Sequence, residues 1–447
     1  MGTTLRKCKW CILLALLPFV VKGQGSDTLK VNLQKALDIA LSDNPTIQIA
    51  DQEIKRVDYS KKEAWHGLIP SLAGSAQISK YVLPAKMSML GNLMDNPADL
   101  VASSSLTLSL PLVVPALWRS IQMTDLQMQL ANEQARASKI TLRNEVTKAY
   151  YQILLAQDSY ETLKEGYDLA KQNYDEAKQR FDLGLAAEYD YISAEVQMQN
   201  LIPTISQVEN GIAQAKLFLK VLMGVDLSIP VAVEGRLTDL ESHVAGATYA
   251  TSLDANSDLI QLEIQQQQLQ KQLQLQRTQR LPTLVGFGKY GYSGSKTKSI
   301  SMDFGGMPMT MPARNDWFTD GFIVGLQLNV PIFSGFTNTL KEKQIGVSVR
   351  TLEIQRAYVR DNLNLQVTAA TDNMAKAVEQ MQASKKGIQL AEKGYTISQE
   401  RYNNGMGTML ELRSASQALT QAKLSYSQAI ADYLGAKADY EKIVGPY

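Results

Sequence analysis

The sequence predicts an α+β membrane protein made of two copies of one unit, each a β-hairpin followed by a long coiled-coil helical hairpin. Three observations predict this fold class. The chain repeats itself at a constant offset of 221 residues, as from Phe181 to Tyr402. Within each copy, apolar residues recur every three or four positions over long stretches, which is typical of coiled-coil helices. Before each of these stretches, apolar and polar residues alternate, which is typical of β-strands.

Residues 1–23 have the pattern of a secretory signal peptide. Arg6, Lys7 and Lys9 precede an apolar run from Trp10 to Val21, and the small residue Gly23 follows. Both cysteines of the chain, Cys8 and Cys11, lie in this segment, so we expect the mature protein to have no thiol, disulfide or lipid anchor.

The charge of the expected mature chain is close to balanced. Without the four basic residues of the signal peptide, 41 of the 45 basic residues remain against 44 acidic ones, a net charge of −3. This balance argues against a nucleic-acid partner.

Four strands are predicted, two in each unit. In the first unit, residues 24–224, they cover about 71–82 and 105–114; in the second unit, residues 251–447, they cover about 283–295 and 321–333. The first strand of each unit follows a proline, Pro70 or Pro282.

The alternating strands have two interpretations. A soluble protein would bury the apolar face of the sheet on a core. A membrane barrel would turn that face to lipid and line its lumen with the small polar residues of the other face, and aromatic residues would flank the strands, as Trp118, Trp317 and Phe333 do. We favour the barrel, because each strand has roughly the ten residues that cross a bilayer at a tilt.

The number of strands predicts an oligomer. Four strands cannot close a barrel, since about eight is the smallest number that encloses side chains, and open sheet edges are not tolerated in lipid. After the signal peptide there is no run of about 18 apolar residues, so a shared barrel is the expected way for this chain to span a membrane.

The helical hairpins are predicted at about 116–222 and 334–444. Each turns at a glycine, Gly184 or Gly405, where the exit from a helix requires a positive φ. A helix over 116–181 would be roughly 100 Å long at about 1.5 Å per residue, the scale of a periplasm. Pro203 should bend the first return helix.

Two further segments have less regular patterns. Residues 225–250 break the coiled-coil spacing and are expected to be a linker with mixed short elements. The glutamine-rich run 261–276 keeps leucines at helical spacing, so we expect a helix rather than a low-complexity tract.

Little in the sequence points to catalysis. His66 and His243 are the only histidines and stand far apart, and no catalytic, phosphate-binding or metal-binding motif is present, so neither an enzyme nor a cofactor is expected. The segments that join the strands are rich in methionine, which binds soft Cu(I) but also fills irregular apolar gaps; we favour packing. These methionines are Met87, Met89, Met94, Met302, Met307, Met309 and Met311.

The duplicated strands, the prolines at their ends and the two turns resemble the TolC family of outer-membrane efflux proteins. The turns read Gln179 to Leu185 and Glu400 to Gly405, and the resemblance covers about residues 33–444. It implies a homotrimer whose twelve strands make one barrel in the outer membrane, continuous with a helical tunnel in the periplasm. It also implies export of substrates from an inner-membrane pump, of the resistance type or the ABC type, through a periplasmic adaptor.

The resemblance further implies a gate at the periplasmic tip. The family has two acidic residues near the second turn, which fall on Glu411 and Ser414 here, and an Arg–Asp tie between the turns, which falls on Gly407 and Asp190. With only one of the two acids and without the tie, we expect the closed state to depend on packing around Tyr189, Tyr402 and the turns at Gly184 and Gly405. The alternative is that Glu411 and Asp190 are ordinary acids at helix starts, which the helix dipole favours.

The expected function is therefore an export channel of the outer membrane. The rival interpretation is an envelope-spanning scaffold or adaptor that does not transport. An adaptor of this kind typically carries a lipoyl-like insertion at the tip of one hairpin, whereas both tips are tight here and all four strands are present.

Overall fold

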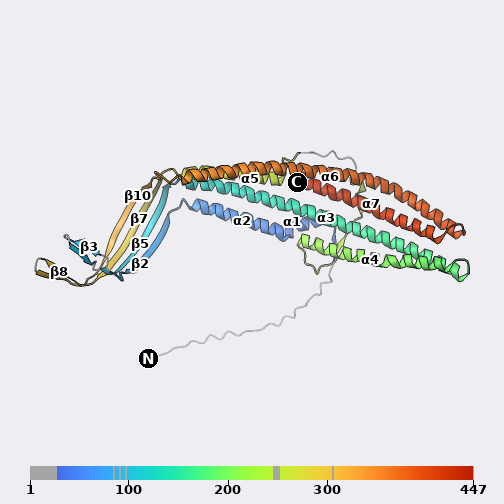
Figure 1. Ribbon diagram of the computed structural model, residues 1–447, viewed down its shortest axis with the longest axis horizontal. Coiled ribbons are helices and arrows are strands. Elements are labelled where there is room, and N and C mark those ends of the chain that lie inside the picture. The colour runs from blue at the N-terminus through green and yellow to red at the C-terminus, as the bar shows by residue number, and fades with distance from the viewer. Residues whose placement is uncertain are drawn as a thin grey trace, which may run out of the picture.

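The computed structural model describes residues 28–83, 86–89, 92–95, 98–244, 252–304 and 307–445. Figure 1 shows an elongated molecule with a β-sheet at one end and a shaft of long helices that ends in two turns at the other. The expected signal peptide, including Cys8 and Cys11, lies outside the described residues.

The first unit contains short helices, strands and a long helical hairpin in that order. Its elements are β1 (Leu29–Val31), α1 (Leu33–Asp43), α2 (Pro45–His66), β2 (Ser71–Lys80), β3 (Lys86–Met89), β4 (Asn92–Asp95), β5 (Ala98–Val113), α3 (Pro115–Asp182) and α4 (Glu188–Met223).

The second unit follows a connection and, from its short helix α5 onward, repeats this order in the described residues. The connection contains β6 (Val231–Val233), which pairs in parallel with β1, and the 3₁₀ helix η1 (Leu237–Val244). The second unit consists of α5 (Ser257–Thr278), β7 (Thr283–Thr297), β8 (Ile300–Phe304), β9 (Met307–Met311), β10 (Asn315–Asn329), α6 (Thr337–Asn403) and α7 (Met409–Val444). The glutamine-rich run thus lies in a helix, α5, as expected.

The four long strands form one antiparallel sheet in the order β10-β7-β5-β2. The pairing of β5 with β7 joins the two units, and β2 and β10 are the free edges of the sheet. The sheet is therefore open in a single chain.

The two faces of the sheet differ in polarity, as the alternation predicts. Leu106 of β5, Tyr290 of β7 and Phe322 of β10 are register partners on one face. On the other face the hydroxyls of Ser75 and Ser105 lie 3.0 Å apart. Phe322 is 70% exposed and Leu106 53%, so no core among the described residues covers the apolar face.

The fourth strand differs from the expected range 321–333, because β10 spans Asn315–Asn329. The pairing shifts by one residue between Thr319 and Gly321, and Gly321 has a φ of +80°. This irregularity interrupts the alternation, so the pattern in the sequence covered only the part after it. Pro331, which has no N–H to donate, follows the end of the strand.

The second strand is also longer than expected. β5 begins at Ala98 rather than at about 105, because the serine run Ser103–Ser105 hides the alternation while its backbone still pairs with β2 and β7. The segments expected as loops, 83–104 and 296–320, contain two small hairpins, β3–β4 and β8–β9.

The return helices join the short helices end to end in both units. Asn44 caps α2 and donates its side-chain amide to the carbonyl of Leu222 at the end of α4, at 2.6 Å. Asn256 caps α5 and donates in the same way to Ile443 of α7, at 2.7 Å. The shaft thereby continues past the ends of α4 and α7 toward the sheet (Figure 1).

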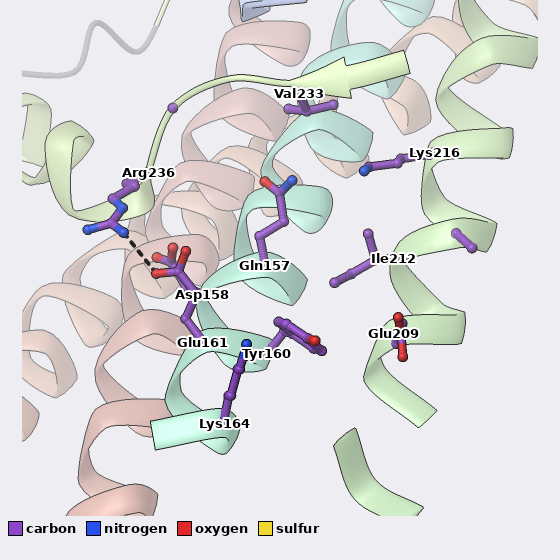
Figure 2. Close-up of a pocket in the computed structure, with 12 residues that line it drawn as sticks. Gln157, Asp158, Tyr160, Glu161, Lys164, Glu209, Ile212, Lys216, Val233 and Arg236 are labelled. Carbon is purple, nitrogen blue, oxygen red and sulfur yellow. Dashed lines mark hydrogen bonds and ion pairs between the residues drawn. The ribbon is translucent and has the colours of Figure 1, made fainter. Parts of the chain in front are cut away.

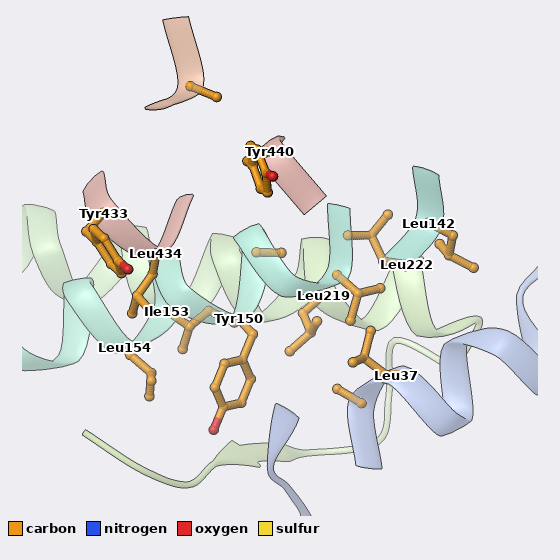
Figure 3. Close-up of a cluster of buried hydrophobic side chains, with 14 of the residues drawn as sticks. Leu37, Leu142, Tyr150, Ile153, Leu154, Leu219, Leu222, Tyr433, Leu434 and Tyr440 are labelled. Carbon is orange, nitrogen blue, oxygen red and sulfur yellow. The ribbon is translucent and has the colours of Figure 1, made fainter. Parts of the chain in front are cut away.

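The main hydrophobic core lies in the middle of the shaft, where α1 joins the long helices (Figure 3). Val146, Ala149 and Ile153 of α3 are buried there, and so are the residues 221 positions later. These are Val367, Ala370 and Met374 of α6.

Pro203 lies inside α4, which runs continuously from Glu188 to Met223, and the expected bend stays a prediction. Within the described residues, no helix combines the length and apolarity of a membrane-spanning helix.

Candidate functional site

The two helical hairpins end side by side at the tip of the shaft, and their turns are built alike (Figure 1). Gly184 and Gly405 have φ values of +72° and +70°. Leu185 N–H donates to the carbonyl of Arg180, and Met406 N–H donates to that of Arg401, both at 2.8 Å. This is a Schellman-type helix end, for which glycine is the favoured residue because it has no Cβ.

Arg180 connects the first hairpin to the second. Its guanidinium donates to the backbone carbonyl of Tyr402 at 2.9 Å and to that of Asn403 at 2.8 Å. It also lies over the Tyr402 ring, with 4.8 Å between the guanidinium carbon and the ring centre. The cation therefore binds the carbonyl end of α6, where the helix dipole is negative.

Tyr402 is the buried centre of the tip. Only 5% of the residue is exposed, and among the described residues none forms a hydrogen bond with its hydroxyl. Burial raises the pKa of the Tyr402 phenol, and the charge of the Asp190 carboxylate raises it further. The structure thus brings two residues singled out in the sequence, Tyr402 and Asp190, close together.

Tyr402 belongs to a small apolar cluster that both hairpins share. The cluster is separate from the main core, and its buried members are Ala177, Ala194, Tyr395, Tyr402, Met409, Leu412 and Leu419. Tyr189, which was expected to pack here, is 69% exposed in the single chain.

Glu411 lies in the first turn of α7 and is half-exposed. Its N–H donates to the Thr408 hydroxyl at 3.3 Å, as in a helix cap, and its carboxylate lies 3.6 Å from the guanidinium of Arg401. Ser414 is exposed, and a Cβ on Gly407 would lie 3.1 Å from Cβ of Arg401. A larger side chain at position 407 would therefore crowd the turn.

Two further contacts connect the hairpins between the tip and the middle of the shaft. Arg413 of α7 donates to the Ser193 hydroxyl of α4 at 3.1 Å, and Lys423 of α7 pairs with Glu165 of α3 at 2.7 Å. Neither these contacts nor those of Arg180 were predicted from the sequence. An arginine in the last turn of a helix is a known signal for carbonyl capping, but nothing in the sequence shows that Arg180 caps a different helix.

At mid-shaft, the connection between the units crosses both hairpins. Arg236 pairs with Glu161 of α3 at 3.0 Å. Glu241 of η1 pairs with Lys385 of α6 at 2.7 Å and accepts a hydrogen bond from the Tyr426 hydroxyl of α7 at 2.7 Å. These two partners hold the pKa of the Glu241 carboxyl below its ordinary value. The connection, η1 included, is thus a strap between the hairpins.

A cavity of about 730 Å³ lies between this strap, α3 and α4 (Figure 2). Its charged side chains balance, with three acids and three bases. They are Asp158, Glu161, Glu209, Lys164, Lys216 and Arg236. Burial raises the pKa of the Asp158 carboxyl, and a hydrogen bond from the backbone of Leu237 opposes that effect.

Comparisons with known proteins identify relatives over most of the chain. Residues 36–225 and 248–445 match the family model described as outer membrane efflux protein. The outer membrane protein TolC of Vibrio cholerae is 21% identical over 350 residues, which are 77% of this chain and 76% of that protein.

Solved outer-membrane channels share the fold. The CmeC channel of Campylobacter jejuni superimposes with a TM-score of 0.72 at 17% identity, covering 92% of this chain and 85% of that one. The open state of the MtrE channel of Neisseria gonorrhoeae gives a TM-score of 0.70 at 16% identity, covering 92% and 88%.

Proposed function

The chain belongs to the outer membrane efflux protein family, and we propose that three copies of it form one export channel through the outer membrane and the periplasm. As a member of this family, it is an efflux channel of the outer membrane with helices in the periplasm. The trimer, the closed barrel and the partners are the proposal.

The observation that carries the proposal is the open sheet with two uncovered faces. Its edges, β2 and β10, run in opposite directions, because each of the three pairings between them is antiparallel. β2 of one copy can therefore pair antiparallel with β10 of the next copy. Three copies of four strands then close a barrel of twelve, with the apolar face toward lipid and the serine-rich face toward the lumen.

The outer helices also leave apolar side chains uncovered. Val196 and Ile202 of α4 are 49% and 45% exposed, and Ile397 and Leu390 of α6, at similar distances from the tip, are 56% and 60% exposed. α4 and α6 belong to different hairpins, so packing of α4 from one copy on α6 of the next would bury both surfaces and close the helical tunnel.

The assembly is tested by mass and conductance. In mild detergent we expect particles of three copies, and in planar bilayers we expect them to conduct ions. A monodisperse monomer of mature mass that still forms pores would contradict the shared barrel. A trimer without conductance would favour the scaffold function over transport.

We propose that the channel receives its substrates from an inner-membrane pump through a periplasmic adaptor. The gene neighbourhood separates the two pump classes. Genes for an adaptor and a resistance-type pump beside this gene would indicate efflux of small compounds, whereas a gene for an ABC transporter would indicate protein secretion.

We propose that the tip is the gate of this channel. In a trimer, three copies of Glu411 would converge near the axis with the turns at Gly184 and Gly405, and three carboxylates close together attract divalent cations. Tyr402 and Asp190 lie at the tip, where the two hairpins of one copy pack against each other. Tyr189 is exposed in the single chain and can pack against a neighbouring copy.

Divalent block tests the role of Glu411. We expect millimolar divalent cations to lower the single-channel conductance of the parent protein, and Glu411→Gln to weaken this block. Glu188→Gln, which removes an exposed acid from the first turn of α4, is the matched control. An equal block in the parent and in Glu411→Gln would remove Glu411 from the gate.

A further inference from the structure

The two small hairpins, β3–β4 and β8–β9, project from the sheet at the end away from the helices (Figure 1). They are unusually rich in methionine. Segments 86–95 and 300–311 contain seven of the 16 methionines of the chain. The function as a channel does not explain this concentration.

The methionines of β9 share one face of their hairpin. Met307, Met309 and Met311 occupy alternate positions of the strand, so their side chains point the same way. Met302 is the register partner of Met309 across the hairpin. On the opposite face the hydroxyls of Ser301 and Thr310 lie 3.1 Å apart. The hairpin thus has a hydroxyl-bearing face and a thioether face.

The thioethers of β9 are not packed in a core of the single chain. Met307, Met309 and Met311 are 76%, 56% and 43% exposed, and the packing that the sequence favours stays a prediction. Same-face neighbours along a strand lie about 6.8 Å apart, and directly paired positions about 5 Å apart. Methionine is long and flexible enough for sulfur atoms at such positions to converge on one ion.

Thioether sulfur is a soft, uncharged ligand that selects soft monovalent cations over Mg²⁺, Ca²⁺ or Mn²⁺. Among the described residues there is no group of three or more His, Cys, Asp and Glu side chains that could hold a metal. Within that part of the chain, no cluster of His, Cys, Asp and Glu would therefore compete with the thioether face for a metal ion.

We propose that the methionine face of β8–β9, defined as Met307, Met309 and Met311 of β9, binds a soft monovalent cation, Cu(I) or Ag(I). The other small hairpin supports this assignment independently. Its surrounding sequence is different, yet Met87 and Met94 are also register partners. The proposal does not depend on the trimer or on the exported substrate.

Silver is the probe of choice, because Ag(I) is not oxidised in air during the measurement. The full mature protein in detergent would be titrated with Ag(I) in equilibrium dialysis, with methyl NMR of methionine labelled at the ε carbon. We expect the resonances of Met307, Met309 and Met311 to shift on binding.

The decisive variant carries Met307→Leu, Met309→Leu and Met311→Leu together. Leucine keeps the volume and the apolar character but removes the sulfur, so the hairpin should fold as before. We expect the Kd for Ag(I) to rise by about tenfold or more. The control is Met406→Leu, which removes one methionine that is 67% exposed at the tip and should leave this site unchanged.

The result that would overturn the proposal is equally clear. If the triple variant binds Ag(I) as tightly as the parent, or if the shifted resonances belong to other methionines, the face is not a metal site. Equal Ag(I) affinity with a change in assembly mass would instead assign the face to contacts between copies.

Discussion

Arg180 is the side chain that most directly joins the two hairpins at the tip. Its guanidinium reaches the second hairpin through two backbone carbonyls, the Asn403 side-chain oxygen and the ring of Tyr402. Arg401, next to Tyr402 in the chain, binds within its own hairpin, to Met406 and Glu411. Lys178, two residues before Arg180, lies over the Tyr174 ring of its own helix and is the matched control for Arg180.

We expect Arg180→Gln to favour an open tip. Loss of its charged hydrogen bonds should lower the preference for the closed state by about 1–2 kcal/mol, five- to thirtyfold in the open population. Single-channel recording in planar bilayers measures this directly. Lys178→Gln removes a positive charge of α3 whose printed contact, with the Tyr174 ring, stays within the same helix, so a similar gain in opening with that variant would refute the role of Arg180.

Tyr151 should make the protein sensitive to alkali. Burial on α3 raises its pKa to about 12, and the charge of Glu441 adds to this effect. In the unfolded chain a tyrosine ionises near pH 10, at about its reference value. Between about pH 10 and 12 the unfolded state therefore loses a proton that the folded state keeps, and stability falls as the pH rises, by up to about 1.4 kcal/mol per pH unit.

The variant Tyr151→Phe isolates this contribution. Thermal unfolding followed by circular dichroism between pH 9 and 12 should show a shallower decline in the variant than in the parent. Tyr189→Phe removes a hydroxyl from an exposed position and controls for loss of a tyrosine in general. Parallel declines in the parent and in Tyr151→Phe would show that other groups cause the alkaline sensitivity.

The end-to-end joints between helices make the shaft continuous, and they depend on glycine. Gly224 ends α4 with a φ of +68°, and a Cβ there would lie 2.6 Å from the carbonyl oxygen of Asp43. Gly445 repeats this at the end of α7, where a Cβ would lie 2.9 Å from the carbonyl of Ala255. Both the positive φ and the close approach of backbone require the absence of a side chain.

We expect Gly224→Ala to destabilise the protein by more than about 1 kcal/mol, because it adds backbone strain and a steric clash at once. Gly211→Ala is the matched control within the same helix, since a Cβ at Gly211 meets nothing within 4 Å. It should be neutral, or stabilising by up to about 1 kcal/mol. Thermal unfolding of the purified proteins decides between these outcomes, and equal midpoints for the two variants would contradict the strain argument.

The strap at mid-shaft connects the two hairpins. Its contacts run from Glu161 of α3 through Arg236 and Glu241 to Lys385 and Tyr426 of the second hairpin. Because these contacts lie between the sheet and the tip, opening of the tip is expected to pivot below them rather than to separate the hairpins along their whole length.

At the scale of the whole molecule, the small hairpins and the tip lie at opposite ends, with the sheet between them (Figure 1). If the sheet spans the membrane, the hairpins and the tip lie on opposite sides of it. If the helices occupy the periplasm, segments 83–104 and 296–320, which contain the small hairpins, must emerge outside the cell. The expected mature protein has no cysteine, so single introduced thiols report their own location.

We expect Met309→Cys to react with an impermeant maleimide on intact cells. Met406→Cys, at a methionine of the tip that is 67% exposed against 56% for Met309, should react only after the outer membrane is permeabilised. Labelling of Met309→Cys only after lysis would contradict the orientation.

Local patterns in the sequence were sufficient to predict much of this molecule. The strands, the paired long helices, the turns at Gly184 and Gly405 and the helix α5 follow from the period of apolar residues and from glycine at helix ends. These features are encoded by residues near one another in the chain, so they appear in a single sequence. The duplication then implied that both halves have the same architecture.

Only the tertiary structure decided which distant residues meet. It placed Arg180 on the carbonyl end of a helix more than 200 residues away, Asn44 on Leu222, and Met302 opposite Met309. It also extended β10 back to Asn315 across an irregularity that hides the alternation. The physical reason is that such contacts depend on helix packing and strand register, which are properties of the whole fold and leave no periodic trace in the chain.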